Sequence, residues 1–77
     1  MIQFTLKKDQ EYIELFKLLK AVDLCNSGGE AKVFIAEGEV EYNGEIDTRK
    51  RLKVRAGDNI AFNNQSVTVN AHTDEEE

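Results

Sequence analysis

The chain has 77 residues, a formal net charge of −5, one cysteine and one histidine. A chain of this length forms a single domain with a modest core, which leaves no room for a large buried active site or a second domain. A lone cysteine excludes an internal disulfide. The N-terminus has no apolar run, so neither a signal peptide nor a membrane span is predicted. We therefore expect a cytoplasmic, globular protein that folds without disulfides or metal.

The charged residues are distributed unevenly along the chain. Residues 1–47 carry five Lys or Arg and ten Asp or Glu. Residues 48–73 carry five Lys or Arg but only one acidic residue. Residues 74–77 are all acidic. Because exposed charges more than about 8 to 10 Å apart are screened at physiological salt, an acidic protein can still bind a polyanion through a local basic face.

Hydrophobic spacing predicts a strand followed by a helix in the N-terminal part. Residues 2–6 alternate hydrophobic and polar side chains, which is typical of a strand with one buried face. Asp9 is a suitable N-cap for a helix that ends near residues 20–22. The apolar stripe of this helix has the i, i+3, i+4, i+7 spacing and consists of Tyr12, Leu15, Phe16 and Leu19.

A second helix is predicted by its capping residues. Ser27 and Glu30 form a capping box, in which the hydroxyl accepts a hydrogen bond from the first turn and the carboxylate reaches back to the cap. The helix should begin at about Gly28, and Gly38 stands where a residue with positive φ would end it. Since the connection between the two helices is short, we expect them to be neighbours in space.

Five strands are predicted after the helices. Asn43 and Gly44 have the residue types that a type I′ turn requires, so they join a strand over residues 39–42 to the strand that follows. Further strands are expected over residues 48–55, 59–62 and 66–69. This order predicts an α+β fold over residues 1–71, in which a helix pair packs on a small twisted antiparallel sheet with an N-terminal strand.

Residues 49–55, named here the basic segment, are the most strongly charged part of the chain. They hold five Lys or Arg and no acid. In a strand, Leu52 and Val54 would face the core, and the basic side chains of alternate residues would share the opposite face. Residues on one face lie about 6.5 to 7 Å apart, which is comparable with the phosphate spacing of an extended nucleic acid strand. Together with the basic residue of the second helix, the candidate binding residues are Lys32, Arg49, Lys50, Arg51, Lys53 and Arg55.

Two motifs carry a family resemblance. Residues 38–44, GEVEYNG, fit the pattern G-x-V-x-x-N-G, and residues 57–60, GDNI, fit G-D-x-I. With these motifs in this order and spacing, residues 9–62 resemble the S4 RNA-binding domain, also called the alpha-L motif, and in particular its short free-standing bacterial members. Many members have Ser-Arg at the start of the second helix. Here Gly28 follows Ser27, which removes a usual phosphate contact.

The resemblance implies a non-catalytic module that binds structured RNA, such as rRNA or tRNA, with a link to the ribosome or to translation. We expect a monomer that needs no cofactor. The sequence has no metal-ligand spacing, and Cys25 and His72 do not form a credible catalytic pair. The bases should be read poorly, because Tyr42 is the only aromatic residue expected to lie near the basic segment for stacking.

Other interpretations of the basic segment stay open. Charged edge strands prevent aggregation, although five basic residues exceed what edge protection needs. The segment is alternatively the docking site of a protein-interaction adaptor for an acidic partner. Residues 72–77 are expected to form a disordered acidic tail that competes weakly with RNA for the basic segment.

Overall fold

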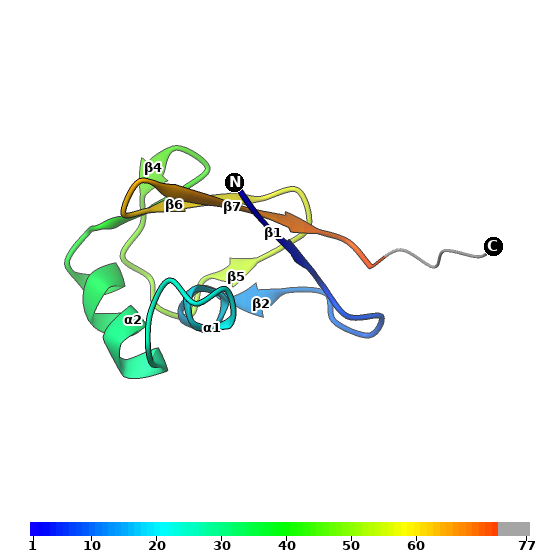
Figure 1. Cartoon of the computed structure of the whole chain (residues 1–77), viewed down its shortest axis with the longest axis horizontal. Coiled ribbons are helices and arrows are strands. Elements are labelled where there is room, and N and C mark those ends of the chain that lie inside the picture. The colour runs from blue at the N-terminus through cyan, green and yellow to red at the C-terminus, as the bar shows by residue number, and fades with distance from the viewer. Residues whose placement is uncertain (73–77) are drawn as a thin grey trace.

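The computed structural model describes residues 1–72, which form two layers, with the helices on one face of a sheet (Figure 1). The acidic tail expected over residues 72–77 lies outside the described residues, apart from His72. The elements follow one another as β1 (Ile2–Thr5), β2 (Ile13–Glu14), α1 (Leu15–Ala21), α2 (Gly28–Ala36), β3 (Val40–Tyr42), β4 (Glu45–Ile46), β5 (Lys53–Val54), β6 (Asn59–Phe62) and β7 (Gln65–Asn70). The predicted α+β class and the helix pair packed on a small sheet are confirmed.

The main sheet has five strands in the order β1-β7-β6-β3-β4. Its inner pairs are antiparallel, as expected, but β1 lies parallel to β7, with Ile2 opposite Val67 and Phe4 opposite Val69. The sheet is therefore mixed and not wholly antiparallel. The sequence pattern could not show this, because parallel and antiparallel strands share the same alternation of side chains.

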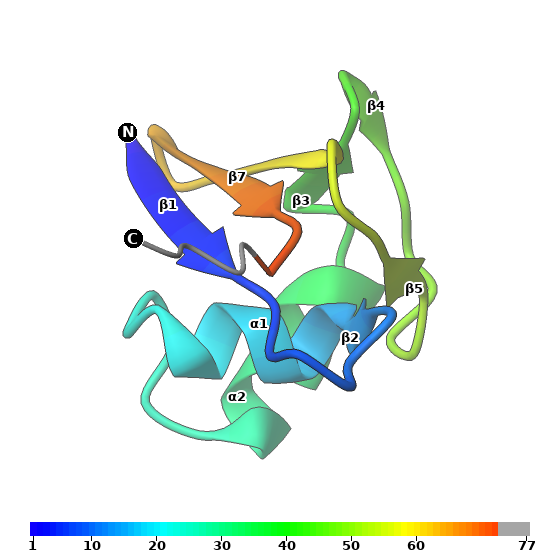
Figure 2. The ribbon, with the colours of Figure 1, turned by 90° about the vertical axis from the view of Figure 1, so that its right-hand side faces the viewer.

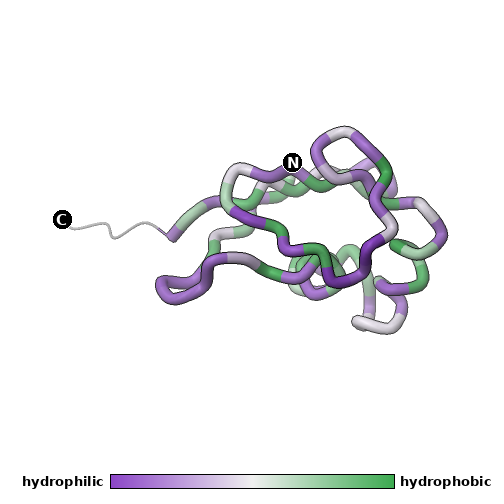
Figure 3. Tube along the Cα trace, turned by 180° about the vertical axis from the view of Figure 1, so that it is seen from behind, coloured by the Kyte–Doolittle hydropathy of each residue, from purple (hydrophilic) through white to green (hydrophobic). Residues whose placement is uncertain are grey.

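Hydrophobic side chains from both layers meet in one core. The largest side chains that are fully buried are Leu15, Leu18, Leu19, Ile35, Val40, Val54, Ile60, Val67 and Val69. The rings of Phe34 on α2 and Phe62 on β6 add a contact between the layers, with centroids 5.1 Å apart. In Figure 3 hydrophobic positions recur along the strands and helices, and hydrophilic stretches form the connecting loops.

Helix α1 begins at Leu15 and not near Asp9, so the predicted N-terminal part of this helix is wrong. Residues 7–10 form a turn instead, in which the Gln10 amide donates to the Lys7 carbonyl (3.0 Å). The N-cap residue of α1, Glu14, makes no side-chain cap bond. The first amides of the helix are satisfied from far along the chain: Leu15 N donates to Leu52 O (2.9 Å) and Phe16 N to Lys50 O (3.2 Å). A helix start that depends on such distant carbonyls leaves no local capping signal.

Helix α2 begins at Gly28, as predicted. The Ser27 hydroxyl accepts a hydrogen bond from Glu30 N (3.1 Å), and the Glu30 carboxylate accepts one from Asn26 N (2.6 Å). The carboxylate thus reaches one residue beyond the cap, which is a variant of the expected capping box. Gly38 follows the helix with φ +78°, as a residue that ends a helix often does.

The predicted turns between the later strands are also present. Asn43 and Gly44 have φ +51° and +92°, the positive values that a type I′ turn requires. Strand β6 has the predicted bounds, and β7 extends one residue further at each end. The next turn has two asparagines, Asn63 and Asn64, at φ +56° and +65°, a conformation that asparagine tolerates better than most residues.

Removing the cap of α2 should weaken the fold without removing any core contact. The variant Ser27→Ala loses the bond from Glu30 N, and the free energy of unfolding should fall by about 1 kcal/mol. Urea denaturation followed by circular dichroism measures this change. Ser66→Ala makes the same chemical change in β7, where the Ser66 side chain makes no hydrogen bond to any residue of 1–72, and should leave stability nearly unchanged. Equal stabilities for Ser27→Ala and the wild type would contradict the capping role.

Candidate nucleic-acid interface

The basic segment is mostly a loop and not the long strand that the alternation predicted. Only Lys53–Val54 are extended as β5, which pairs antiparallel with β2 in a separate two-stranded sheet. The prediction that the basic segment belongs to the same sheet as the final strand is therefore wrong. The predicted inward positions hold in part, since Val54 is fully buried and Leu52 is half-buried. The segment lacks a neighbouring strand over most of its length because its carbonyls are used to start α1.

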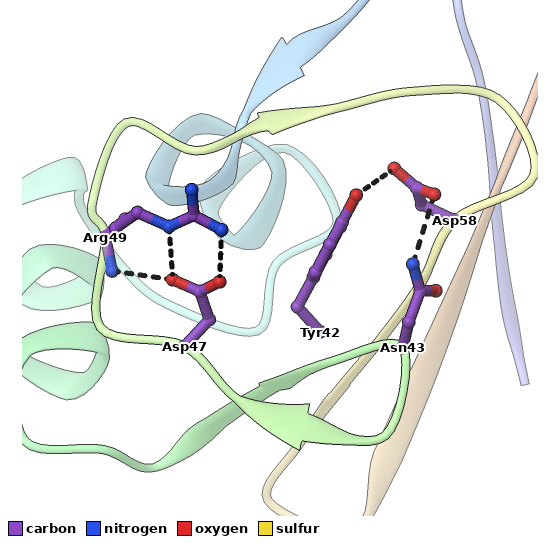
Figure 4. A network of polar contacts seen from close by, with 5 residues as sticks. All are labelled: Tyr42, Asn43, Asp47, Arg49 and Asp58. Atoms are coloured by element: carbon purple, nitrogen blue, oxygen red, sulfur yellow. Dashed lines mark hydrogen bonds and ion pairs between the residues drawn. The ribbon is translucent and has the colours of Figure 1, made fainter.

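Arg49 is already neutralised by an acid within the chain. Its Nε and Nη2 donate to the two carboxylate oxygens of Asp47 at 2.9 and 2.7 Å, and its backbone amide donates to the same group (Figure 4). These hydrogen bonds lower the pKa of Asp47 and raise that of Arg49. Asp47 lies just before the basic segment, so a count of charges within the segment alone misses this acidic partner. Of the predicted residues, Arg49 is thus the least available to an external anion.

A half-buried phenylalanine gathers basic side chains from α1, α2 and the basic segment. The Phe16 ring centroid lies 4.5 Å from Lys32 Nζ, 5.4 Å from Arg51 Cζ and 5.8 Å from Lys17 Nζ. Gly28 also faces this ring, since a Cβ there would come 3.3 Å from Phe16 Cδ2. Lys32 and Arg51, 19 positions apart in sequence, therefore share one surface.

The basic side chains at the C-terminal end of the basic segment lie over a second aromatic ring. The Tyr12 centroid lies 5.1 Å from Lys53 Nζ and 5.7 Å from Arg55 Cζ. Tyr12 and Phe16 were predicted to lie on the buried stripe of a longer helix, and Lys17 was not among the predicted binding residues. Both rings are half-buried because α1 begins later than predicted, and no local sequence signal indicates that late start.

Few carboxylates face this surface. Glu14 Oε1 lies 3.5 Å from both Lys17 Nζ and Arg51 Nη1. Within residues 1–72, by contrast, no carboxylate oxygen lies within 4.0 Å of the charged groups of Lys32, Lys50, Lys53 and Arg55. These cations rest on aromatic rings or project into solvent, so their charge stays available to an anion.

Tyr42 was expected to be available for base stacking, but it belongs to a hydrogen-bond network centred on Asp58. Its hydroxyl donates to Asp58 Oδ2 at 2.8 Å, and Asn43 Nδ2 donates to Asp58 Oδ1 at 3.2 Å (Figure 4). The backbone amide of Arg55 also donates to Asp58 Oδ2 (2.9 Å). One carboxylate thus ties the β3–β4 turn to the end of the basic segment.

The same network explains the two sequence motifs and shifts two pKa values. Asn43 exchanges hydrogen bonds with Asn59, its amide donating to Asn59 O and its Oδ1 accepting from Asn59 N, both at 2.8 Å. The hydrogen bond to Asp58 raises the pKa of Tyr42. Partial burial opposes ionisation of Asp58, but the bonds from Arg55 N, Tyr42 and Asn43 outweigh it and lower its pKa. Both motifs therefore position the basic segment.

Cys25 is buried, and desolvation together with the nearby Glu30 charge raises the pKa of its thiol, which disfavours the reactive thiolate. Across the described part of the chain, no three His, Cys, Asp or Glu side chains are grouped as metal ligands. Likewise, none of the helices in residues 1–72 has the length and apolar character to cross a membrane.

Comparison with known proteins identifies the family to which the fold is similar. A family model described as S4 domain matches residues 4–70. The Escherichia coli (strain K12) protein named "Putative RNA-binding protein YbcJ" is 44% identical over 69 residues, which cover 90% of this chain and 97% of that protein. The Bacillus subtilis (strain 168) protein named "Probable ribosome maturation protein RlbA" is 46% identical over 50 residues, or 65% of this chain and 70% of that protein.

A solved structure is also similar. The solution structure of E. coli YbcJ, described as revealing an alfaL motif involved in RNA-binding, matches with a TM-score of 0.71 at 44% identity. The match covers 92% of this chain and 89% of that one. The expected resemblance to the alpha-L fold of short bacterial proteins is confirmed.

Replacing the central carboxylate should destabilise the fold in a pH-dependent way. At pH 7, Asp58→Asn should lower the free energy of unfolding by about 1 to 3 kcal/mol, because one side of the amide can no longer accept a hydrogen bond. The folded-state pKa of Asp58 lies below its unfolded value of about 3.9, so its stabilisation is complete above that pH and is lost as the pH falls through the folded value.

Urea denaturation of both proteins at a series of pH values tests this expectation. The stabilities of the wild type and Asp58→Asn should converge below about pH 4. Tyr42→Phe, which removes one of the three donors, should cost about 1 kcal/mol and serves as the matched smaller change. A constant difference between wild type and Asp58→Asn across the pH range would show that the ionised carboxylate is not the source of the effect.

Proposed function

Because this chain belongs to the S4 domain family, we propose that it is a non-catalytic RNA-binding module that holds the phosphate backbone of structured RNA on the face around Phe16 and Tyr12. The observation that carries the proposal is the arrangement of four cations, which lie over the rings of Phe16 (Lys32 and Arg51) and Tyr12 (Lys53 and Arg55). These residues come from two separate parts of the sequence. A run of basic residues that arose by chance would not be expected to lie beside a basic residue from a separate helix.

The available groups indicate how RNA would be bound. Arginine can hold a phosphate with two parallel hydrogen bonds, and lysine acts as a compact point charge, so both favour the backbone over the bases. The two rings on this face are covered by cations, and the hydroxyl of Tyr42 is bonded to Asp58. Base stacking therefore contributes little, and recognition should depend on the shape of a folded RNA.

We also infer a role at the ribosome, in the cytoplasm, with rRNA as the favoured RNA. The support is the name of the B. subtilis relative, "Probable ribosome maturation protein RlbA". A small module that binds backbone phosphates with little base recognition suits a large folded RNA, where shape supplies the specificity. We propose that the protein acts as a monomer, because one chain presents the complete basic face.

Neutralising the centre of the face should weaken RNA binding strongly. Arg51→Gln with Lys53→Gln removes two of the four converging cations, so affinity for a fluorescein-labelled rRNA hairpin should fall about tenfold to a hundredfold at low salt. If the wild type contacts four phosphates, its log K against log[salt] should slope by about −3 on single-stranded RNA and slightly more steeply on a duplex. Fluorescence anisotropy at several salt concentrations measures both quantities.

A matched control keeps the change in net charge the same. Asn64→Asp with Gln65→Glu also lowers the net charge by two, but it does so at the β6–β7 turn, outside the basic face. This control should bind RNA nearly as well as the wild type. A slope near zero, or equal affinities for the two double variants, would refute the proposed face. Retained capture of an acidic protein without RNA binding would favour the adaptor function.

The contribution of α2 can be measured separately. Lys32→Met keeps an unbranched side chain to pack on Phe16 but removes the charge, so stability should be retained while RNA affinity falls about threefold to tenfold at low salt. Lys32→Arg should bind like the wild type. Identical affinities for Lys32→Met and the wild type at low salt would show that α2 does not contact the RNA.

A further inference from the structure

We propose that the RNA-binding face continues beyond Arg55 into a hollow beside the β1–β2 loop, where Lys7 and Lys8 hold a further stretch of phosphate backbone. This inference rests on the RNA binding proposed above and extends its footprint. Neither lysine was among the residues that the sequence suggested.

The hollow brings together two loops that are distant in sequence. Its lining includes Lys7, Lys8, Gln10 and Glu11 from the β1–β2 loop and Arg55 and Ala56 from the end of the basic segment. In Figure 2 the β1–β2 loop passes close to β2 and β5, at the same side of the molecule. Arg55 also lies over Tyr12 together with Lys53, so it belongs to both regions and joins them.

Hydrogen bonds fix both walls of the hollow. Lys7 N donates to Gln10 Oε1 and Gln10 N donates to Lys7 O, each at 3.0 Å, which closes a tight turn. The preceding residue is tied to the sheet by Leu6 N donating to Asn70 O (2.9 Å). On the other wall, Gly57 N donates to Val69 O (2.8 Å). Because the backbone is already ordered, binding there costs little conformational entropy.

The charge balance of the hollow favours an anion. Lys7, Lys8 and Arg55 supply three positive charges and Glu11 one negative charge among the lining residues named above. For the described residues, no carboxylate oxygen comes within 4.0 Å of the charged groups of these three cations. Cations that line one hollow without forming ion pairs repel one another, and a phosphate would relieve that repulsion.

The chemistry fits a phosphate chain better than a single small anion. The hollow is open, and two of its cations are flexible lysines that offer point charges without fixed geometry. The cations gather at two rings, Phe16 and Tyr12, and Arg55 also lines the hollow, so the whole array exceeds what a single phosphate group can contact. A polyanion that binds the cations over both rings would therefore extend past Arg55 into the hollow.

The test uses the same rRNA hairpin and the full chain. Lys7→Gln with Lys8→Gln should weaken binding about five- to tenfold at low salt and make the salt dependence shallower by about 0.7 to 1.8, the value for one or two lost phosphate contacts. Asn64→Asp with Gln65→Glu, which changes the net charge equally, should leave both quantities unchanged. Thermal unfolding of each variant checks that the fold is retained, and Lys7→Arg with Lys8→Arg should bind like the wild type.

The outcomes separate this inference from the proposed function. Unchanged affinity and salt dependence for Lys7→Gln with Lys8→Gln, while Arg51→Gln with Lys53→Gln binds weakly, would overturn the extension and leave the RNA function intact. An equal loss in the charge-matched control would also overturn it, because the effect would then reflect net charge alone. Failure of the wild type to bind the hairpin would refute both proposals.

Discussion

The backbone attachment of the basic segment to the start of α1 is the constraint on which the rest of the site depends. Leu15 N and Phe16 N donate to the carbonyls of Leu52 and Lys50, and the short β2–β5 pairing continues the same attachment. Buried amides at a helix start require partners, so neither α1 nor the basic segment is complete without the other. This attachment places the basic side chains over the rings of Tyr12 and Phe16. The Asp58 network holds the other end of the segment in place.

The way in which the cations are held explains how a protein with a net charge of −5 can present a usable basic face. The guanidinium of Arg49 is paired with both carboxylate oxygens of Asp47, so its charge is largely neutralised within the chain. Lys32, Lys53 and Arg55 instead rest on aromatic rings, contacts worth about 0.5 to 1 kcal/mol at exposed sites that do not cancel the charge. The aromatic rings therefore orient the cations while leaving them free to attract phosphate.

Local signals predicted much of this fold, and the errors share one cause. The capping residues Ser27 and Glu30 located α2, and Asn43 with Gly44 located a hairpin, because these devices act within a few residues. The start of α1, the parallel pairing of β1 and the loop form of the basic segment all depend on distant partners. The candidate residues were chosen mainly for their charge, so Asp47 beside Arg49 was overlooked. Tyr12 and Phe16 were assigned to the core, and Lys17 was not among the candidates.

The central claim is that one continuous face, built on Tyr12 and Phe16, receives RNA. Mapping backbone amide shifts by nuclear magnetic resonance during titration with an rRNA hairpin tests it most directly, because the method reports every contacted region at once. Saturable shifts should be concentrated in residues 12–17, 28–32 and 50–55, and in residues 7–8 beside the hollow, with the β6–β7 turn unaffected. Shifts centred on the turn at Asn63 and Asn64, or no saturable shifts at low salt, would contradict it.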